Sequence, residues 1–120
     1  MPNPPAAKLR VLVVEDDAAT LTLAVELLDL LGHWAAGVTS AEAAMNRFLE
    51  GAFDVLLIDL NLPGLSGMEL AERLRRRESL PVIFASGDDP SGQELPPGTW
   101  WLAKPYTTRE LGIALAHCKQ

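Results

Sequence analysis

The sequence predicts an α/β fold in which a parallel sheet carries helices on both of its faces. Three observations support this fold class. Short apolar runs alternate with segments of helical spacing, which is the pattern of successive βαβ units. The run Val55-Leu56-Leu57-Ile58 is apolar at every position, as expected of a strand buried on both faces. Capping-box patterns open several of the helical segments, which marks where those helices begin.

Five apolar segments are predicted to form the strands. Their ranges are 9–14, 33–38, 55–59, 81–86 and 99–103. Helical segments separate the first four, so right-handed crossovers are expected to join parallel strands. The segment 55–59 is central because it ends in Asp59, and open α/β sheets place their ligand sites at the carboxyl ends of the strands. Taken alone, Asp59 would more often cap a strand or start a turn.

Four helices are predicted, over 18–31, 39–50, 66–77 and 107–118. The last three open on capping boxes, which begin at Thr39, Ser66 and Thr107. Asp17 is expected to cap the first helix or to be solvated, and Gly32 to end that helix. Residues 87–98 contain three prolines and three glycines, so we expect at most one short turn there, over 91–95.

The composition indicates one globular domain. The 120 residues carry a net charge of −6, which argues against a nucleic-acid partner because the phosphate backbone would repel the chain. The single cysteine, Cys118, excludes an internal disulfide and suits a reducing cytoplasm. No apolar run approaches the ~20 residues of a membrane span. Residues 1–7 are expected to form a flexible lead-in rather than a signal peptide, and residues 8–120 the domain.

Polar side chains stand at the carboxyl ends of four predicted strands. They are Glu15 with Asp16, then Asp59, Ser86 and Lys104. Because these ends share one edge of a parallel sheet, the side chains are expected to converge. Two carboxylates about 4 Å apart repel by about 4 kcal/mol at an effective dielectric near 20, so the cluster needs cations. Oxygen ligands favour Mg²⁺, and a carboxylate beside Mg²⁺ and a lysine is placed to attack phosphorus.

At this point the chain resembles the response-regulator receiver domains of two-component signalling. The resemblance extends from Lys8 onward and rests on four motifs in order, VLVVEDD, DVLLIDLNLPGLSGMEL, VIFASG and LAKPY. It implies a flavodoxin-like, doubly wound five-stranded sheet in the order 2-1-3-4-5. It also implies a phosphoprotein that carries an aspartyl phosphate.

The resemblance further implies a role for each residue of the cluster. Asp59 would be the phosphoacceptor and Asp16 a direct Mg²⁺ ligand. Glu15 would bind the ion through water and balance Lys104. Asn61 would offer its backbone carbonyl to the metal.

Four more residues match family positions that form the conformational switch, orient the lysine or leave space for the phosphoryl group. Ser86 resembles the switch hydroxyl, and Trp101, three residues before Lys104, resembles the switch aromatic. The bond between Lys104 and Pro105 resembles the family's cis peptide, which aims the ammonium group. Gly87 would leave space for the phosphoryl group.

The chain departs from the family between Ser86 and Lys104. This interval is shorter than usual, and the Pro/Gly-rich segment stands where the family's fourth helix belongs. That helix, with the neighbouring strand and helix, forms the usual output and dimer surface. The resemblance therefore leaves open both the oligomeric state and the working of the switch.

The leading functional hypothesis is a phosphoacceptor receiver with no other enzymatic activity. A sensor histidine kinase or histidine phosphotransfer protein would donate the phosphoryl group, and the receiver would catalyse only its own transfer and dephosphorylation. The donor would dock near 18–25 and Tyr106, and an unknown downstream protein would take the signal. The chain would be either a stand-alone receiver or a piece of a larger regulator or hybrid kinase.

Two alternatives remain from the sequence. One is a receiver-like interaction module that works without phosphorylation, which the degenerate fourth-helix region favours. The other is a small Mg²⁺ phosphatase of the haloacid-dehalogenase type, but these enzymes place an acid where this chain has Asn61.

Several residues also have ordinary structural interpretations. Glu15 and Asp16 would otherwise cap the first helix, and Trp100 and Trp101 would be packing aromatics. The run 75–77 reads as the solvated end of a helix. Four further residues are interpreted as structural or surface positions: His33, Trp34, His117 and Cys118.

Overall fold

The computed structural model describes residues 8–88 and 94–118. The expected lead-in, 1–7, lies outside the described residues, as does most of the short turn expected over 91–95. Among the described residues, no helix has the length and apolarity that crossing a membrane would demand.

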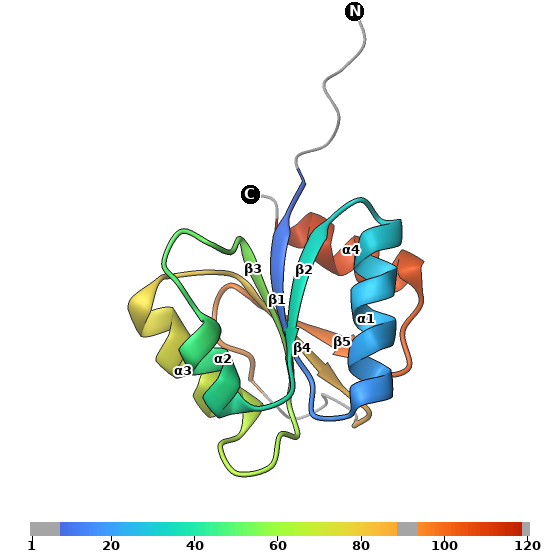
Figure 1. The fold of residues 1–120 in the computed structure, drawn as a ribbon. Helices are drawn as coiled ribbons and strands as arrows, with labels where there is room; N and C mark the ends of the chain where they lie inside the picture. Colours follow the sequence, from blue (N-terminus) through green and yellow to red (C-terminus); the bar gives the residue numbers. More distant parts are fainter. Residues whose placement is uncertain (1–7, 89–93, 119–120) are drawn as a thin grey trace, which may run out of the picture.

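The strands form a single parallel sheet (Figure 1), and the predicted order is confirmed. The sheet runs β2-β1-β3-β4-β5, with all neighbours parallel. The strand bounds are β1 Arg10–Val14, β2 Trp34–Val38, β3 Val55–Asp59, β4 Val82–Ser86 and β5 Thr99–Ala103. All positions of β3 and β4 are buried, as the unbroken apolar run predicted.

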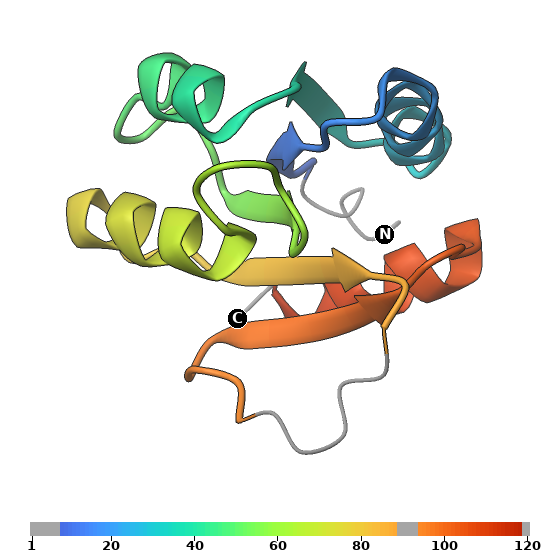
Figure 2. The ribbon, with the colours of Figure 1, turned by 90° about the horizontal axis from the view of Figure 1, so that it is seen from below.

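Four helices cover the two faces of this sheet. Their bounds are α1 Ala18–Leu30, α2 Ala41–Arg47, α3 Gly67–Arg77 and α4 Thr108–His117. Figure 2 shows α1 and α4 on one face, and α2 and α3 on the other. Each face has its own apolar core, one centred on Leu56 and Phe84 and the other on Leu57 and Ile83. The doubly wound architecture is therefore confirmed.

Each helix begins at a side-chain N-cap close to the position that the sequence predicted, and one of these caps differs by one residue. Asp17 caps α1 and accepts a hydrogen bond from Thr20 N at 2.9 Å. Thr107 and Glu110 form the complete capping box of α4. The box expected to begin at Thr39 was misplaced by one residue, because Ser40 is the N-cap of α2.

Helix α2 ends at Arg47, earlier than the expected Glu50. Phe48 leaves the helix with an extended backbone, φ −69° and ψ 126°. This turn buries its ring, which is 1% exposed and stacks on Phe53 with ring centroids 6.1 Å apart. Burial of an aromatic side chain contributes more than another helical turn at the surface, so core packing ends the helix.

The end of α3 is also more structured than the sequence indicated, because Arg77 is exposed, as the solvated interpretation expects, but also forms specific contacts. Its guanidinium donates to the carbonyl oxygens of Met45 and Phe48, both at 3.2 Å. It also lies 5.0 Å from the centre of the Phe48 ring. Arg77 therefore satisfies free carbonyl groups where α2 ends.

The connection from β4 to β5 contains no helix among its described residues, which are 87–88 and 94–98. The expectation of a short or missing fourth helix agrees with this part of the chain. Beside that connection, β5 has only one buried residue, Leu102, in contrast to the fully buried β4.

Candidate functional site

Four strands deliver polar side chains to one edge of the sheet. Glu15 follows β1, Asp59 and Ser86 end β3 and β4, and Lys104 follows β5. The register places Asp59 beside Ala85, and Ser86 beside Ala103. Glu15, Asp59 and Ser86 are 5%, 6% and 0% exposed. The predicted convergence is thus realised by buried groups, which is the state in which charge interactions are strongest.

Three carboxylates meet at this edge. Ligand oxygens from Glu15, Asp16 and Asp59 all lie within 4.8 Å of one another. Asp16 is exposed, whereas the other two are buried. The set consists entirely of oxygen donors with one side open to solvent, which suits Mg²⁺ because this ion keeps several waters.

Lys104 neutralises part of this charge. Its Nζ donates a hydrogen bond to Glu15 Oε1, and it lies 3.3 Å from Asp59 Oδ1. The peptide bond from Lys104 to Pro105 is cis. Burial lowers the pKa of Lys104, but the hydrogen bonds and charges of the two carboxylates outweigh burial and raise it, so the ammonium form persists.

The two buried carboxyls differ in their readiness to ionise. Burial raises the pKa of Glu15, and hydrogen bonds from Lys104 and Asp17 N oppose this only in part. Burial acts in the same direction on Asp59. Its hydrogen bonds from Asn61 N, at 3.1 Å, and from Glu15 and Lys104 outweigh burial and lower its pKa. The lowered pKa of Asp59 favours its ionised form, in which a carboxylate can act as a nucleophile.

Ser86 and Asn61 are joined through Asp88. Asp88 N donates to Ser86 Oγ at 3.0 Å, and Asn61 Nδ2 donates to Asp88 Oδ2 at 3.4 Å. The link connects the loop after β3 to the loop after β4, beside Asp59. The sequence placed Asn61 and Ser86 near the site, but this contact depends on loop conformation and carries no sequence signal.

Gly67 is a residue of the site that the sequence reasoning missed. A Cβ atom there would lie 2.3 Å from the carbonyl oxygen of Asp59, so only glycine lets α3 start against the end of β3. Gly87, for which the family resemblance implied a need for space, has no atom within 4 Å of such a Cβ.

Trp101, the predicted switch aromatic, lies on β5. It is in register with Phe84 of β4, and Phe84 belongs to the core beneath α2 and α3. Trp101 is half-buried, and its Nε1 is buried with no hydrogen-bond partner among the described residues. Trp100 instead stacks on His117 of α4, with ring centroids 6.0 Å apart.

An apolar groove adjoins the site between α1 and the start of the loop after β5. Its volume is about 230 Å³. Its lining is mainly apolar and comprises Thr20, Leu23, Ala24, Lys104, Pro105 and Tyr106. Burial raises the pKa of Tyr106 to about 12, with a further contribution from Glu15 and Asp59, so Tyr106 keeps its proton.

Comparison with known proteins agrees with this geometry. A model of the response regulator receiver domain matches residues 11–95. The virulence sensor protein BvgS of Bordetella pertussis is 46% identical over 80 residues, which cover 67% of this chain and 6% of that protein. The sensory transduction protein RegX3 of Mycobacterium tuberculosis is 38% identical over 106 residues, 84% of this chain and 46% of that protein.

The fold has a close counterpart among solved structures. A response regulator receiver domain protein from Clostridium thermocellum superposes with a TM-score of 0.83 and 25% identity, covering 92% of this chain and 93% of that one. This chain spans less than half the length of the two curated relatives. From the matched family model, the sheet order and the acidic edge together, the chain belongs to the response regulator receiver domains of two-component signalling.

Proposed function

We propose that Asp59 accepts a phosphoryl group from a phosphohistidine donor and that the receiver then signals by contact with a downstream protein. The observation that carries this proposal is the state of Asp59. It is a buried carboxylate with a lowered pKa, 3.3 Å from the Lys104 ammonium and surrounded by two further acids. A carboxylate kept ionised beside a cation is a competent nucleophile toward phosphorus.

The transfer step forms one bond and breaks one. A carboxylate oxygen of Asp59 attacks phosphorus, the bond from phosphorus to the donor's imidazole nitrogen breaks, and the imidazole leaves with that electron pair. Lys104 and the hydroxyl of Ser86 would stabilise the charge on the phosphoryl oxygens. In this proposal the domain catalyses only its own phosphorylation and dephosphorylation.

We assign the metal ligands to the same edge. Asp16 and Asp59 would bind Mg²⁺ directly, Asn61 through its backbone carbonyl, and Glu15 through water. When bound, the ion supplies positive charge to the phosphoryl oxygens. The chain's own contribution is to hold the carboxylates within 4.8 Å of one another and to limit their repulsion through Lys104.

In this proposal, the conformational switch depends on breaking a hydrogen bond of the Ser86 hydroxyl. In the structure, the Ser86 hydroxyl accepts a hydrogen bond from Asp88 N. A phosphoryl group on Asp59 would compete for that hydroxyl, which frees the loop after β4. Trp101, half-exposed on β5, would then adjust its packing.

The groove beside the site supports a docking place for the donor. Leu23 in this groove is 51% exposed, and Pro105 is exposed as well. We therefore assign α1 and the loop after β5 to a sensor histidine kinase or a histidine phosphotransfer protein. The free thiol of Cys118 fits the reducing cytoplasm in which such donors act.

The proposal is tested by phosphorylation with a small phosphodonor such as acetyl phosphate. With Mg²⁺ present, the wild type should gain one acid-labile phosphoryl group on a phosphate-affinity gel. Asp59→Asn should gain none, while Asp54→Asn, which alters an aspartate at the opposite end of β3, should behave as wild type. Uptake by Asp59→Asn would refute the assignment.

A second candidate is a receiver that binds its partner without phosphorylation. The absence of a helix among the described residues between β4 and β5 favours it, because that region usually responds to the phosphoryl group. In this case neither acetyl phosphate nor beryllofluoride would alter tryptophan emission. Sustained turnover of an unrelated phosphate ester would instead indicate a phosphatase.

A further inference from the structure

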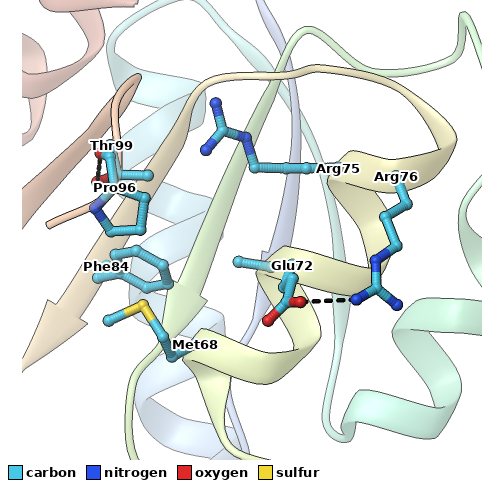
Figure 3. A pocket seen from close by; sticks show the side chains of 8 residues that line it. Met68, Glu72, Arg75, Arg76, Phe84, Pro96 and Thr99 are labelled. Atoms are coloured by element: carbon cyan, nitrogen blue, oxygen red, sulfur yellow. Dashed lines mark hydrogen bonds and ion pairs between the residues drawn. The ribbon is translucent and has the colours of Figure 1, made fainter.

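A groove lies on the face of the sheet beside α3, about 350 Å³ in volume. Figure 3 shows its position between α3 and the segment that leads into β5. Its apolar lining comes from Met68, Ala71, Phe84 and Pro96, and Thr99 closes one side. The groove is distinct from the carboxylate edge, because it shares no residue with it.

The groove exists because this part of the sheet has no helix of its own among the described residues. Helices α2 and α3 occupy that face (Figure 2), and the described residues from β4 to β5 form no third helix. Thr99 and Trp101 of β5 are consequently half-exposed. In α/β folds such a face is normally covered by a helix, so an occupant of that shape would complete the layer.

The rim of the groove carries two arginines and one glutamate of α3, which are Arg75, Arg76 and Glu72. Two other arginines of the same helix, Arg73 and Arg77, are not among the residues that line the groove. Arg76 pairs with Glu72 at 2.7 Å, and Arg77 is used at the end of α2. Arg75 is therefore the arginine of the rim whose charge is not offset by an ion pair among the described residues.

Arg75 is the basic residue of this rim that is available for a ligand. Among the described residues it forms no ion pair, and its Nε is buried without a hydrogen-bond partner. Figure 3 shows its side chain extending away from Arg76 and toward Pro96 and Thr99. A buried guanidinium nitrogen without a partner is costly, and a carboxylate is its best partner because it accepts bidentate hydrogen bonds.

We propose that this groove binds an acidic amphipathic helix of a partner protein. One apolar side chain of the helix would rest on Met68 and Pro96, which are the accessible apolar residues of the lining, and a carboxylate at the next turn would pair with Arg75. The occupant is a helix because it lies alongside α3 on a parallel sheet. It is acidic because Arg75 borders the groove without an ion-pair partner among the described residues. This inference is independent of phosphoryl transfer, since no residue of the carboxylate edge takes part.

The probe for this proposal is a synthetic peptide of about 18 residues, long enough to form a helix, with leucines on one face and glutamates elsewhere. A matched control replaces every glutamate by lysine. Fluorescence anisotropy of the labelled peptides should show saturable binding of the acidic peptide, and binding at least about tenfold weaker for the basic one. Equal binding of both peptides would overturn the proposal, because a merely acidic protein would prefer the basic one.

Variants locate the site. Arg75→Glu should weaken binding of the acidic peptide by at least about tenfold, and Arg75→Gln by less. Arg109→Glu, the same change at an exposed arginine of α4, should bind as wild type. Circular dichroism and thermal unfolding establish that each variant is folded. Unchanged affinity of folded Arg75→Glu would refute the site, and dimers of the free protein broken by Arg75→Glu would refute a partner as the occupant.

Discussion

Lys104 Nζ lies 3.3 Å from Asp59 Oδ1 and also donates to Glu15, so one ammonium group bridges the two buried carboxylates. Lys104 and Glu15 are 89 positions apart in the sequence, so their spacing along the chain gives no sign of this contact. The cation does two things at once. It holds the two carboxylates together without a metal, and it neutralises part of the charge that a bound metal would otherwise neutralise.

The first prediction concerns Lys104→Ala. Without Mg²⁺ the variant should lose about 1–3 kcal/mol of unfolding free energy, because two buried carboxylates are left without a cation. Mg²⁺ binding should be retained, and saturating Mg²⁺ should recover more stability in the variant than it adds to the wild type. Urea unfolding with and without Mg²⁺ measures both quantities. A variant as stable as wild type in the absence of Mg²⁺ would contradict this account of the bridge.

Phosphorylated Lys104→Ala should also fail to bind the downstream protein.

The second prediction concerns the contact of α3 with the end of β3. Gly67→Ala should cost about 1–3 kcal/mol of unfolding free energy, because its Cβ would press on the Asp59 carbonyl. It should also slow phosphorylation by shifting Asp59. Gly87→Ala is the matched control, because no atom lies within 4 Å of its added Cβ, and its stability should change by less than about 0.5 kcal/mol. Equal effects of the two substitutions would rule out the steric explanation.

The third prediction separates two neighbouring arginines. Arg77→Met keeps an apolar side chain against Phe48 but loses the hydrogen bonds to the carbonyls of Met45 and Phe48, at a cost of about 1 kcal/mol. Arg76→Met loses only an exposed pair with Glu72 and should cost less than about 0.5 kcal/mol. Chemical denaturation of both variants makes the comparison. The reverse order of stabilities would show that the end of α2 does not depend on Arg77.

The fourth prediction is a pH dependence at the opposite edge of the sheet. The hydrogen bonds and charge of Arg10, at 3.0 and 3.1 Å, lower the pKa of Asp54. A lowered folded-state pKa adds stability above the ordinary aspartate pKa of about 3.9, and this stability disappears as the pH falls through the folded-state value. Asp54→Asn should therefore lower Tm at pH 7.

The same pair predicts how that difference changes with acidity. The gap in Tm between wild type and Asp54→Asn should stay constant from pH 7 to about 5 and shrink below about pH 4. Thermal scans over this range test it. A gap that widens on acidification would mean that the carboxylate is not the stabilising form.

Much of the fold was accessible from the sequence because periodicity and turn chemistry are local. The buried run 55–58 and the caps at Asp17 and Thr107 all act within a few residues. The convergence of Glu15, Asp59 and Lys104 could also be predicted, because parallel strands leave their carboxyl ends at one edge.

The features that were missed depend on packing between distant segments. Phe48 ends α2 to reach Phe53, and Arg77 crosses from α3 to satisfy carbonyls of another helix. Gly67 is needed only because α3 approaches the Asp59 carbonyl. None of these contacts produces a local sequence pattern, because each one forms only when distant segments pack together in the folded chain.

The burial of β3 has a consequence for the signal that we propose starts at Asp59. This strand is hydrogen-bonded on both sides and buried at all five positions, so its amide protons should exchange with solvent more slowly than those of the loops around it. Asp59, the proposed phosphoacceptor, is thus the last residue of a strand that is paired on both sides. If Asp59 is phosphorylated as proposed, we expect the added charge to act on the hydrogen bond from Asp88 N to Ser86 Oγ rather than to displace the strand.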